Sequence, residues 1–322
     1  MSDRESPNPT GIVAQRHPSS SSALLRLYDL CHLMLENFLD SLLAFFTRKS
    51  KLQRLLEFRP AYKAISYTSL ERCLGLRIHE LRNSKLIDQV LEENGMKMGS
   101  DDAHSNALRA RLVDAIEHFH AYQQLMQQVE TIRSQSFDAQ NPLHEAKLKE
   151  YWALCCPEEE LPARIGKHWG RLGFQGEDPS TDFRGMGILS LDQLIFFAVQ
   201  EPEEFNRIFH LQAHPVLGFP MAVAGINMTA LCRGLLNSGR LKNHFYNNCT
   251  QGEASRGIEM VDFHRVYCRV FSLFCDAWIA ANPDSVMKFN VLRMEFERRL
   301  EAYLQTDGAD LETLDCDLLN TF

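Results

Sequence analysis

Arg184 is the residue whose type and setting are best suited to chemistry. A guanidinium stays charged and presents a planar fork of N–H donors that can bridge two oxygens of a phosphate group. Its neighbours in the chain are Phe183 and Gly185. An aromatic side chain at that position could anchor the backbone while the guanidinium points into solvent. A second interpretation stays open, in which Arg184 pairs with Asp182 or Asp178 and only stabilises its loop.

The stretch from Trp169 to Leu194, WGRLGFQGEDPSTDFRGMGILSLDQL, is predicted to connect two helices. Upstream, apolar residues recur at helical spacing from Leu161 to Leu172, which predicts a helix. Downstream, a helix is predicted from about Leu191 until proline interrupts it at Pro202. The connection between them, about residues 175 to 189, is long enough to suggest a function.

Local patterns predict how this loop ends. Ser190 and Gln193 have the spacing of a capping box, and Leu189 and Leu194 have that of a hydrophobic staple. Together they would fix the end of the loop, so that Arg184 is displayed from a firm support.

Turn-forming residues punctuate the loop itself. Asp178-Pro179 marks a turn. Gly185 and Gly187 flank the arginine side of the loop and permit backbone angles that are closed to other residues.

Composition limits the classes of function. The chain has 322 residues, of which 45% are hydrophobic and 24% charged, and its net charge is -8. These values predict a globular protein, and they argue against nucleic acid as the main partner because phosphate binding needs a concentrated basic surface. The nine cysteines are scattered apart from Cys155-Cys156, which favours reduced cytosolic thiols over a disulfide framework or a zinc site.

Motifs for independent catalysis are absent from the sequence. It contains no P-loop, no G-x-S-x-G, no H-E-x-x-H, and no kinase or dinucleotide fingerprint. His118 and His120 are two residues apart and do not share a helix face, while Pro215 follows His214 of the His210/His214 pair. We therefore expect no metal and no cofactor in this chain. If it supports catalysis, it lends a group to a partner's active site.

Residues 23–46 form a strongly apolar segment that is predicted to be an amphipathic helix. Its four charges, at positions 26, 29, 36 and 40, fall on one stripe and argue against a membrane span. Four basic residues follow between 48 and 54. We expect the apolar face to pack on the rest of the protein. Peripheral contact with an anionic membrane through residues 23–54 is the alternative.

The rest of the chain shows helical periodicity and no alternating strand pattern, so the predicted fold class is all-α. Helices are expected within 52–94, interrupted at Pro60, and at 107–134, after Pro220, 260–281 and 285–304. Residues 92–102 are predicted to be a linker. The predicted organisation is a disordered tail at 1–22, a helical region at 23–142, a domain at 143–305 and a loose acidic tail at 306–322.

The loop motif resembles the signature of the ELMO domain, and more narrowly that of the short ELMO-domain-containing proteins. The residues that carry the resemblance are Trp169, Gly173-Phe174-Gln175, Asp178-Pro179, Thr181-Asp182-Phe183-Arg184-Gly185, Gly187, Leu191 and Leu194. The resemblance continues into LGFPMAVAGINMTAL at 217–231 and covers about residues 143 to 305.

The resemblance implies a GTPase-activating protein for Arf and Arf-like small GTPases. Arg184 would be the catalytic arginine, and the partner GTPase would hold GTP and Mg²⁺. The larger ELMO scaffold proteins generally lack this arginine, so its presence favours the GTPase-activating branch. A non-catalytic adaptor or effector that binds small GTPases or their regulators is the alternative. A cytoplasmic protein that can associate with organelle membranes is expected.

The resemblance also implies a role for the other residues of the motif as a partner-binding loop. Within it, we expect Trp169 and Phe174 to anchor the loop and the Gln175 amide to hold it rather than to orient a water molecule. Asp182 would aim Arg184 through a hydrogen bond. Gly185 and Gly187 would let the loop approach the partner closely.

Overall fold

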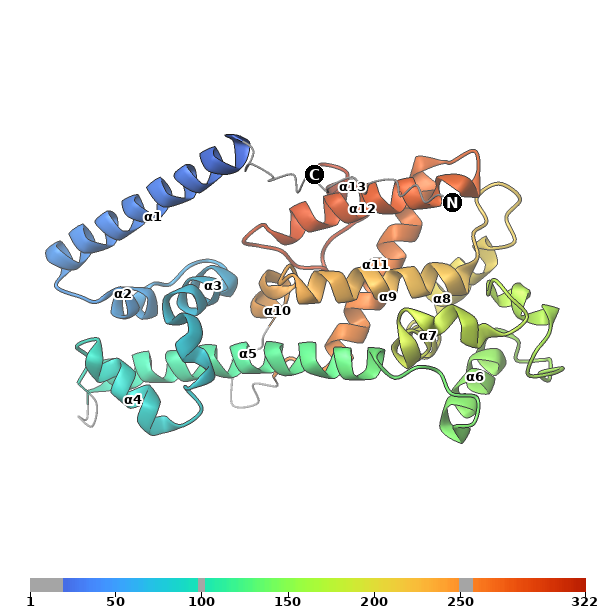
Figure 1. Cartoon of the computed structure of the whole chain (residues 1–322), viewed down its shortest axis with the longest axis horizontal. Coiled ribbons are helices and arrows are strands. Elements are labelled where there is room, and N and C mark those ends of the chain that lie inside the picture. The colour runs from blue at the N-terminus through green and yellow to red at the C-terminus, as the bar shows by residue number, and fades with distance from the viewer. Residues whose placement is uncertain (1–19, 98–101, 249–256) are drawn as a thin grey trace, which may run out of the picture.

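The computed structural model describes residues 20–97, 102–248 and 257–322, and within these ranges every regular element is a helix (Figure 1). This confirms the all-α prediction. The α-helices are α1 (Ser20–Thr47), α2 (Lys51–Glu57), α3 (Lys63–Leu74), α4 (Ser84–Glu93), α5 (Ala103–Arg133), α6 (Pro142–Cys155), α7 (Gly187–Gln200), α8 (Pro202–Leu211), α9 (Met221–Asn237), α10 (Lys242–Asn248), α11 (Met260–Ala281), α12 (Phe289–Leu304) and α13 (Cys316–Leu319). Four 3₁₀ helices join them: η1 (Gly75–His79), η2 (Lys167–Leu172), η3 (Pro179–Arg184) and η4 (Val286–Lys288).

Helix α5 runs along one side of the molecule and connects its two ends (Figure 1). It begins where the Asp102 carboxylate accepts hydrogen bonds from the backbone N–H groups of His104 and Ser105. Helices α2 to α4 contact it, as do α7, α9 and α11. Buried apolar residues from Leu52 to Leu319 form one core cluster, so the predicted regions 23–142 and 143–305 share a core. The boundary between them stays a prediction.

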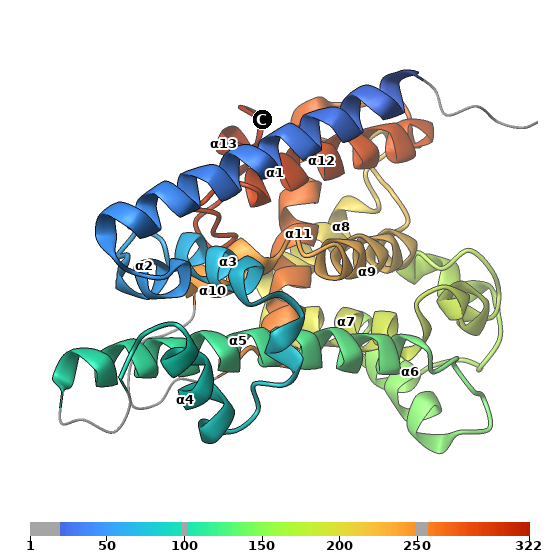
Figure 2. The ribbon, with the colours of Figure 1, turned by 60° about the vertical axis from the view of Figure 1, so that its left-hand side comes forward.

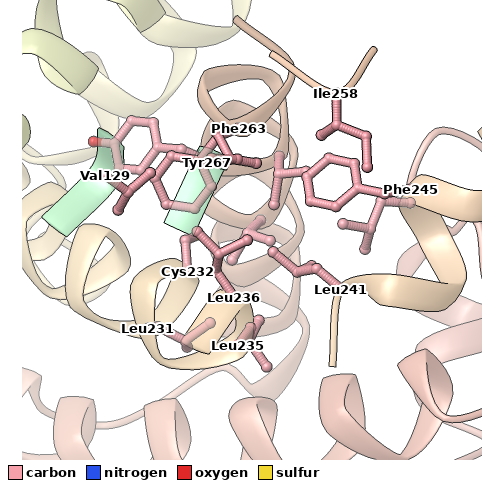
Figure 3. Packing of buried hydrophobic residues seen from close by; sticks show 14 of the residues in the cluster. Val129, Leu231, Cys232, Leu235, Leu236, Leu241, Phe245, Ile258, Phe263 and Tyr267 are labelled. Carbon is pink, nitrogen blue, oxygen red and sulfur yellow. The ribbon is translucent and has the colours of Figure 1, made fainter. Parts of the chain in front are cut away.

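The centre of the core lies where α9 and α11 pack near α5 (Figure 3). Val129 from α5, Leu236 from α9 and Tyr267 from α11 are all fully buried there. Full burial of side chains of this size stabilises a fold by about 1.5–3 kcal/mol each. Helix α9 begins directly after Pro220, as predicted, and is a core helix.

The expected packing of residues 23–46 on the protein is wrong for the part of this helix whose side chains are described, from Leu30 onward. Among the described side chains of α1, none is buried, and nine large apolar residues are exposed. By length and composition alone, Leu30–Thr47 is apolar enough to cross a membrane. The predicted tail at 1–22 also needs a correction, because α1 already begins at Ser20. Residues 1–19 lie outside the described part of the chain.

The C-terminal residues 306–322 are not loose, in contrast to the prediction. Ala309, Leu311, Leu314 and Leu319 are buried, and the Arg269 guanidinium donates a hydrogen bond to the carbonyl oxygen of Leu311 at 3.0 Å. The acidic composition of this segment concealed these few apolar anchors. Since they are spaced irregularly, they carry no helical periodicity that sequence reasoning could detect.

Protonation of His264 is expected to weaken the fold under mildly acidic conditions. Its ring lies 4.9 Å from the Phe196 ring, and burial together with nearby Lys147 lowers its pKa to about 4. An unfolded chain binds this proton near pH 6.5, so the contribution to stability is complete above that pH and is lost as the pH falls from 6.5 toward 4. At pH 5 the loss should be about 2 kcal/mol.

Urea unfolding at pH 7.5 and pH 5 tests this expectation. The His264→Phe variant keeps the ring contact and cannot titrate. Its free energy of unfolding should therefore fall less between pH 7.5 and pH 5 than that of the wild type, and the two decreases should differ by about 2 kcal/mol. Equal pH dependence in both proteins would contradict the assignment.

Candidate functional site

The loop that carries Arg184 joins α6 to α7 and contains only two short 3₁₀ helices, η2 and η3. The α-helix predicted from Leu161 to Leu172 is therefore wrong. Ile165, one of its apolar positions, is 57% exposed. Gly173 ends η2 with φ +87°, and a Cβ there would lie 2.3 Å from the backbone nitrogen of Met221. The close approach to α9 turns the chain where a continuous helix would have to pass.

Helix α7 begins at Gly187, four residues earlier than predicted, and the predicted capping box does not form. Ser190 lies inside the helix, where its hydroxyl donates to the carbonyl oxygen of Gly187 at 2.9 Å. Gln193 is fully buried rather than turned back to the helix start. Sequence spacing identified the right region, but the start of the helix is determined by a backbone contact with α5.

Gly187 makes that backbone contact at the C-terminal end of α5. Its φ is +56°, and a Cβ on it would lie 2.2 Å from the carbonyl oxygen of Arg133 and 2.4 Å from that of Gln135. The next residue, Ile188, donates its backbone N–H to the Gln135 carbonyl at 2.9 Å. Only glycine fits this left-handed, closely packed position. The downstream end of the loop is thus held against a carbonyl-rich helix end.

Aromatic side chains hold the inner side of the loop. Trp169, Phe174 and Phe183 are all buried. The ring centroids of Trp169 and Phe174 are 5.8 Å apart, and those of Phe174 and Phe183 are 5.6 Å apart, both in edge-to-face geometry. Phe183 also stacks on Phe137 at 5.7 Å. Such pairs contribute about 0.5–1.5 kcal/mol each beyond their burial. Trp169 and Phe174 are therefore part of the support beneath the loop surface.

Asp178 forms part of an ion-pair network, not a pair with Arg184. The Arg164 guanidinium donates to Asp178 at 2.8 Å and to Glu145 of α6 at 2.6 Å. Asp178 also accepts from the backbone N–H of Ser180 at 3.0 Å, which caps η3. Burial alone would raise the pKa of Asp178, but the hydrogen bonds from Arg164 and Ser180 outweigh it and lower the pKa. This network fixes the start of η3 to α6.

Asp182 does not aim Arg184 as expected. Its carboxylate accepts a hydrogen bond from the backbone N–H of Gln175 at 2.8 Å, which closes the loop on itself. Gln175 is exposed, and it is the backbone of this residue that holds the loop. The interpretation in which Arg184 pairs with Asp182 or Asp178 is also wrong within the described residues, because Arg184 forms no ion pair there.

Arg184 lies at the end of η3 with its side chain exposed. Its Nε donates a hydrogen bond to the carbonyl oxygen of Thr181 at 2.8 Å. This bond uses one donor and restrains the guanidinium, while the two terminal nitrogens make no hydrogen bond to any other described residue. The arginine is thus restrained at its base, and its outer fork remains available to a partner.

The motif residues divide into a buried layer and an exposed layer. The buried layer supports the loop: Trp169, Gly173, Phe174, Pro179, Phe183 and Gly187. Asp178 and Asp182 are half-buried and make the polar contacts described above. The exposed motif residues are Gln175, Thr181, Arg184 and Gly185, and Gly176 and Glu177 between them in the chain are exposed as well.

The comparison with known protein families identifies the family of this chain. The family model described as ELMO/CED-12 family matches residues 127–293. The chain belongs to the ELMO/CED-12 family. The match begins within α5, upstream of the predicted limit at residue 143, and therefore includes the helix end on which Gly187 rests.

Curated relatives carry the same family name. Mouse ELMO domain-containing protein 2 is 35% identical over 235 residues, which are 73% of this chain and 77% of that protein. Bovine ELMO domain-containing protein 1 is 32% identical over 248 residues, covering 72% and 73%. ELMO domain-containing protein B of Dictyostelium discoideum is 35% identical over 198 residues, covering 62% and 66%. The suspected resemblance to ELMO-domain-containing proteins is confirmed.

Sequence reasoning missed the residues outside the motif that support the Arg184 loop. Arg164 links the loop to α6, and the carbonyl groups of Arg133 and Gln135 receive α7. Arg133 also pairs with Glu130, which accepts a hydrogen bond from Arg233 of α9 at 2.8 Å. A backbone carbonyl leaves no trace in residue type, so the sequence pointed to Gly187 but offered no signal for its contact partner on α5.

Two glycine substitutions test the geometry of the support. Gly187→Ala should lower the free energy of unfolding by about 2–4 kcal/mol, because the new methyl group would clash with two backbone carbonyls at a left-handed position. Gly185→Ala is the matched control: its φ is -82° and no atom lies within 4 Å of its Cβ position. It should change stability by less than about 1 kcal/mol. Urea unfolding of both variants provides the measurement, and equal effects would contradict the proposed contact.

Proposed function

We propose that this protein is a GTPase-activating protein for Arf or Arf-like small GTPases, with Arg184 as an arginine finger supplied in trans. The observation that carries the proposal is the state of Arg184, which is exposed and restrained through Nε while its terminal nitrogens remain free of described partners. Membership of the ELMO/CED-12 family and similarity to ELMO domain-containing proteins support it.

The chemistry follows from the needs of phosphoryl transfer. The partner GTPase holds GTP and Mg²⁺, and negative charge in the transition state lies on the oxygens of the transferred phosphoryl group. The terminal nitrogens of Arg184 bridge two of these oxygens, which stabilises the transition state. An arginine finger contributes about 10³–10⁵ in rate. The hydrogen bond from Nε to Thr181 reduces the conformational freedom that the side chain would otherwise lose on docking.

The exposed layer of the loop forms the contact surface around the finger. Thr181 and Gly185 lie next to Arg184, and the position of a Cβ on Gly185 is open. A partner's backbone can therefore approach Gly185 closely. Gly187 has a different role from the one expected, because it is buried against α5 and cannot reach a partner.

The proposed location is the cytoplasm, with association to organelle membranes through residues 23–54. Exposure of the apolar residues of α1 supports the second part.

A non-catalytic adaptor is the second candidate function. The same exposed layer could bind a GTP-bound partner without accelerating hydrolysis. The hydrogen bond from Nε to Thr181 favours the catalytic function, since it orients the guanidinium before a partner docks.

Arg184→Lys separates these two functions. Lysine keeps the positive charge but cannot bridge two oxygens, so stimulated GTP hydrolysis should fall at least about a hundredfold. Binding to the GTPase loaded with a non-hydrolysable GTP analogue should change little. The measurement is single-turnover GTP hydrolysis by purified Arf-family GTPases with and without the protein.

Arg171→Lys is the matched control, because Arg171 lies in the same loop and is exposed but pairs with Glu159. The Arg171→Lys variant should stimulate GTP hydrolysis as the wild type does. Full activity of Arg184→Lys would exclude the arginine finger, and binding without any acceleration by the wild type would establish the adaptor.

A further inference from the structure

A helix that packs on a soluble core turns its apolar face toward the protein, whereas α1 turns its apolar face toward solvent. Its half-buried residues are Glu36, Asp40 and Ala44, which recur every four residues and so share one face. The Asp40 carboxylate forms ion pairs with Lys51 and, at 2.9 Å, with Arg54 of α2. The side of α1 that carries Asp40 is thus turned toward α2 and is held there by these two ion pairs.

The opposite face of α1 consists of large apolar side chains in solvent. Phe45 and Phe46 are 77% and 76% exposed, and the nine large apolar residues on the described part of the helix are Leu30, Met34, Leu35, Phe38, Leu39, Leu42, Leu43, Phe45 and Phe46. Scattered exposed apolar residues are common, but a continuous apolar face of this size marks an interaction surface.

A second apolar face lies at the start of α12. Met287 of η4 and Val291 and Met294 of α12 are 85%, 69% and 63% exposed, and their spacing places them on one side. Phe296 and Leu300 of the same helix are buried, so the exposed side faces away from the core. Helices α1 and α12 lie on the same side of the molecule in both views, opposite α5 (Figures 1 and 2).

We propose that the outer faces of α1 and of the η4–α12 segment together form one membrane-contact side that lies on the surface of a lipid bilayer. Both faces are convex helix surfaces. A bilayer can accommodate two such helices side by side in its interfacial plane, whereas a groove on a partner protein typically binds a single helix, so the bilayer is the better match. A helix that lies in the bilayer interface turns its apolar face to the lipid and its polar face to the protein on the aqueous side, and α1 has this orientation.

Local charge supports an anionic bilayer as the occupant. Residues 48–63 contain six basic residues and one acidic residue, although the net charge of the whole chain is -8. Lys49, Lys51 and Arg54 form ion pairs with Glu57 and Asp40, and the segment together with Asp40 still carries a net positive charge. Basic residues beside an interfacial helix strengthen attachment to anionic lipids. Since Asp40 is held by α2 through two ion pairs, α1 lies along the surface and does not span the bilayer. The inference is independent of any GTPase-activating function.

Vesicle flotation of the full chain tests the proposal. Vesicles of phosphatidylcholine with phosphatidylserine should carry the wild-type protein upward, and pure phosphatidylcholine vesicles should carry less. Phe45→Glu/Phe46→Glu should weaken binding at least about tenfold, because two large apolar side chains no longer enter the bilayer. Met287→Glu/Met294→Glu should also weaken it, by at least about fivefold.

Leu143→Glu is the matched control, because Leu143 is 71% exposed on α6, on the opposite side of the molecule from α1 and α12 (Figure 1). It should bind vesicles like the wild type. Circular dichroism should confirm that all variants keep their helical content.

Four results would overturn the proposal. The first is a wild-type protein that does not float. The second is a α12 variant that binds as well as the wild type, which would exclude the two-part face. The third is resistance to extraction at alkaline pH, which would indicate a spanning helix. The fourth is self-association through these faces without flotation, which would show a second copy as the occupant.

Discussion

The contact between the start of α7 and the end of α5 is the constraint on which the candidate site depends. At Gly187 the backbone passes so close to the carbonyl oxygens of Arg133 and Gln135 that no side chain fits. The adjacent hydrogen bond from Ile188 to Gln135 fixes the direction in which α7 leaves the loop. Because α5 also contacts α2 to α4, the loop is tied through one helix to the far end of the molecule.

Upstream of Gly187, three further kinds of contact hold the loop. Aromatic rings beneath it provide apolar contact, the Arg164 network joins it to α6, and Asp182 closes it through Gln175. Each contact contributes only about one or a few kcal/mol. Their combined effect is to place the backbone of Arg184 at a defined position. A group that acts in another protein's active site needs this kind of support, since misplacement by 1 Å can cost about a hundredfold in rate.

Sequence patterns predicted the elements better than their contacts. The long helix around residues 107–134, the core helix after Pro220 and the helix at 260–281 follow from apolar periodicity, which is a local property. The orientation of α1 could not be predicted in the same way. Its stripe of charges was visible, but whether that stripe or the apolar face turns toward the protein depends on the ion pairs of Asp40 with α2.

In the candidate site, too, local features were easier to predict than contacts between distant segments. Residue types predicted the turn at Asp178-Pro179, where η3 begins, whereas the capping box at Ser190 and Gln193 was wrong because a tertiary contact starts α7 earlier. The role of Arg184 stays a prediction. Similarly, Asp182 lies next to Phe183 and Arg184 in sequence, yet its carboxylate binds the backbone of Gln175. Spacing can show which groups are able to meet, but packing of distant backbone decides which of them do.

The most direct measurement of the central claim is a structure of this protein bound to an Arf-family GTPase with GDP and aluminium fluoride, which mimics the transferred phosphoryl group. If Arg184 is an arginine finger, its terminal nitrogens contact the fluoride while its Nε still donates to the Thr181 carbonyl. A complex in which Arg184 lies away from the nucleotide, or in which another residue contacts the fluoride, would contradict it.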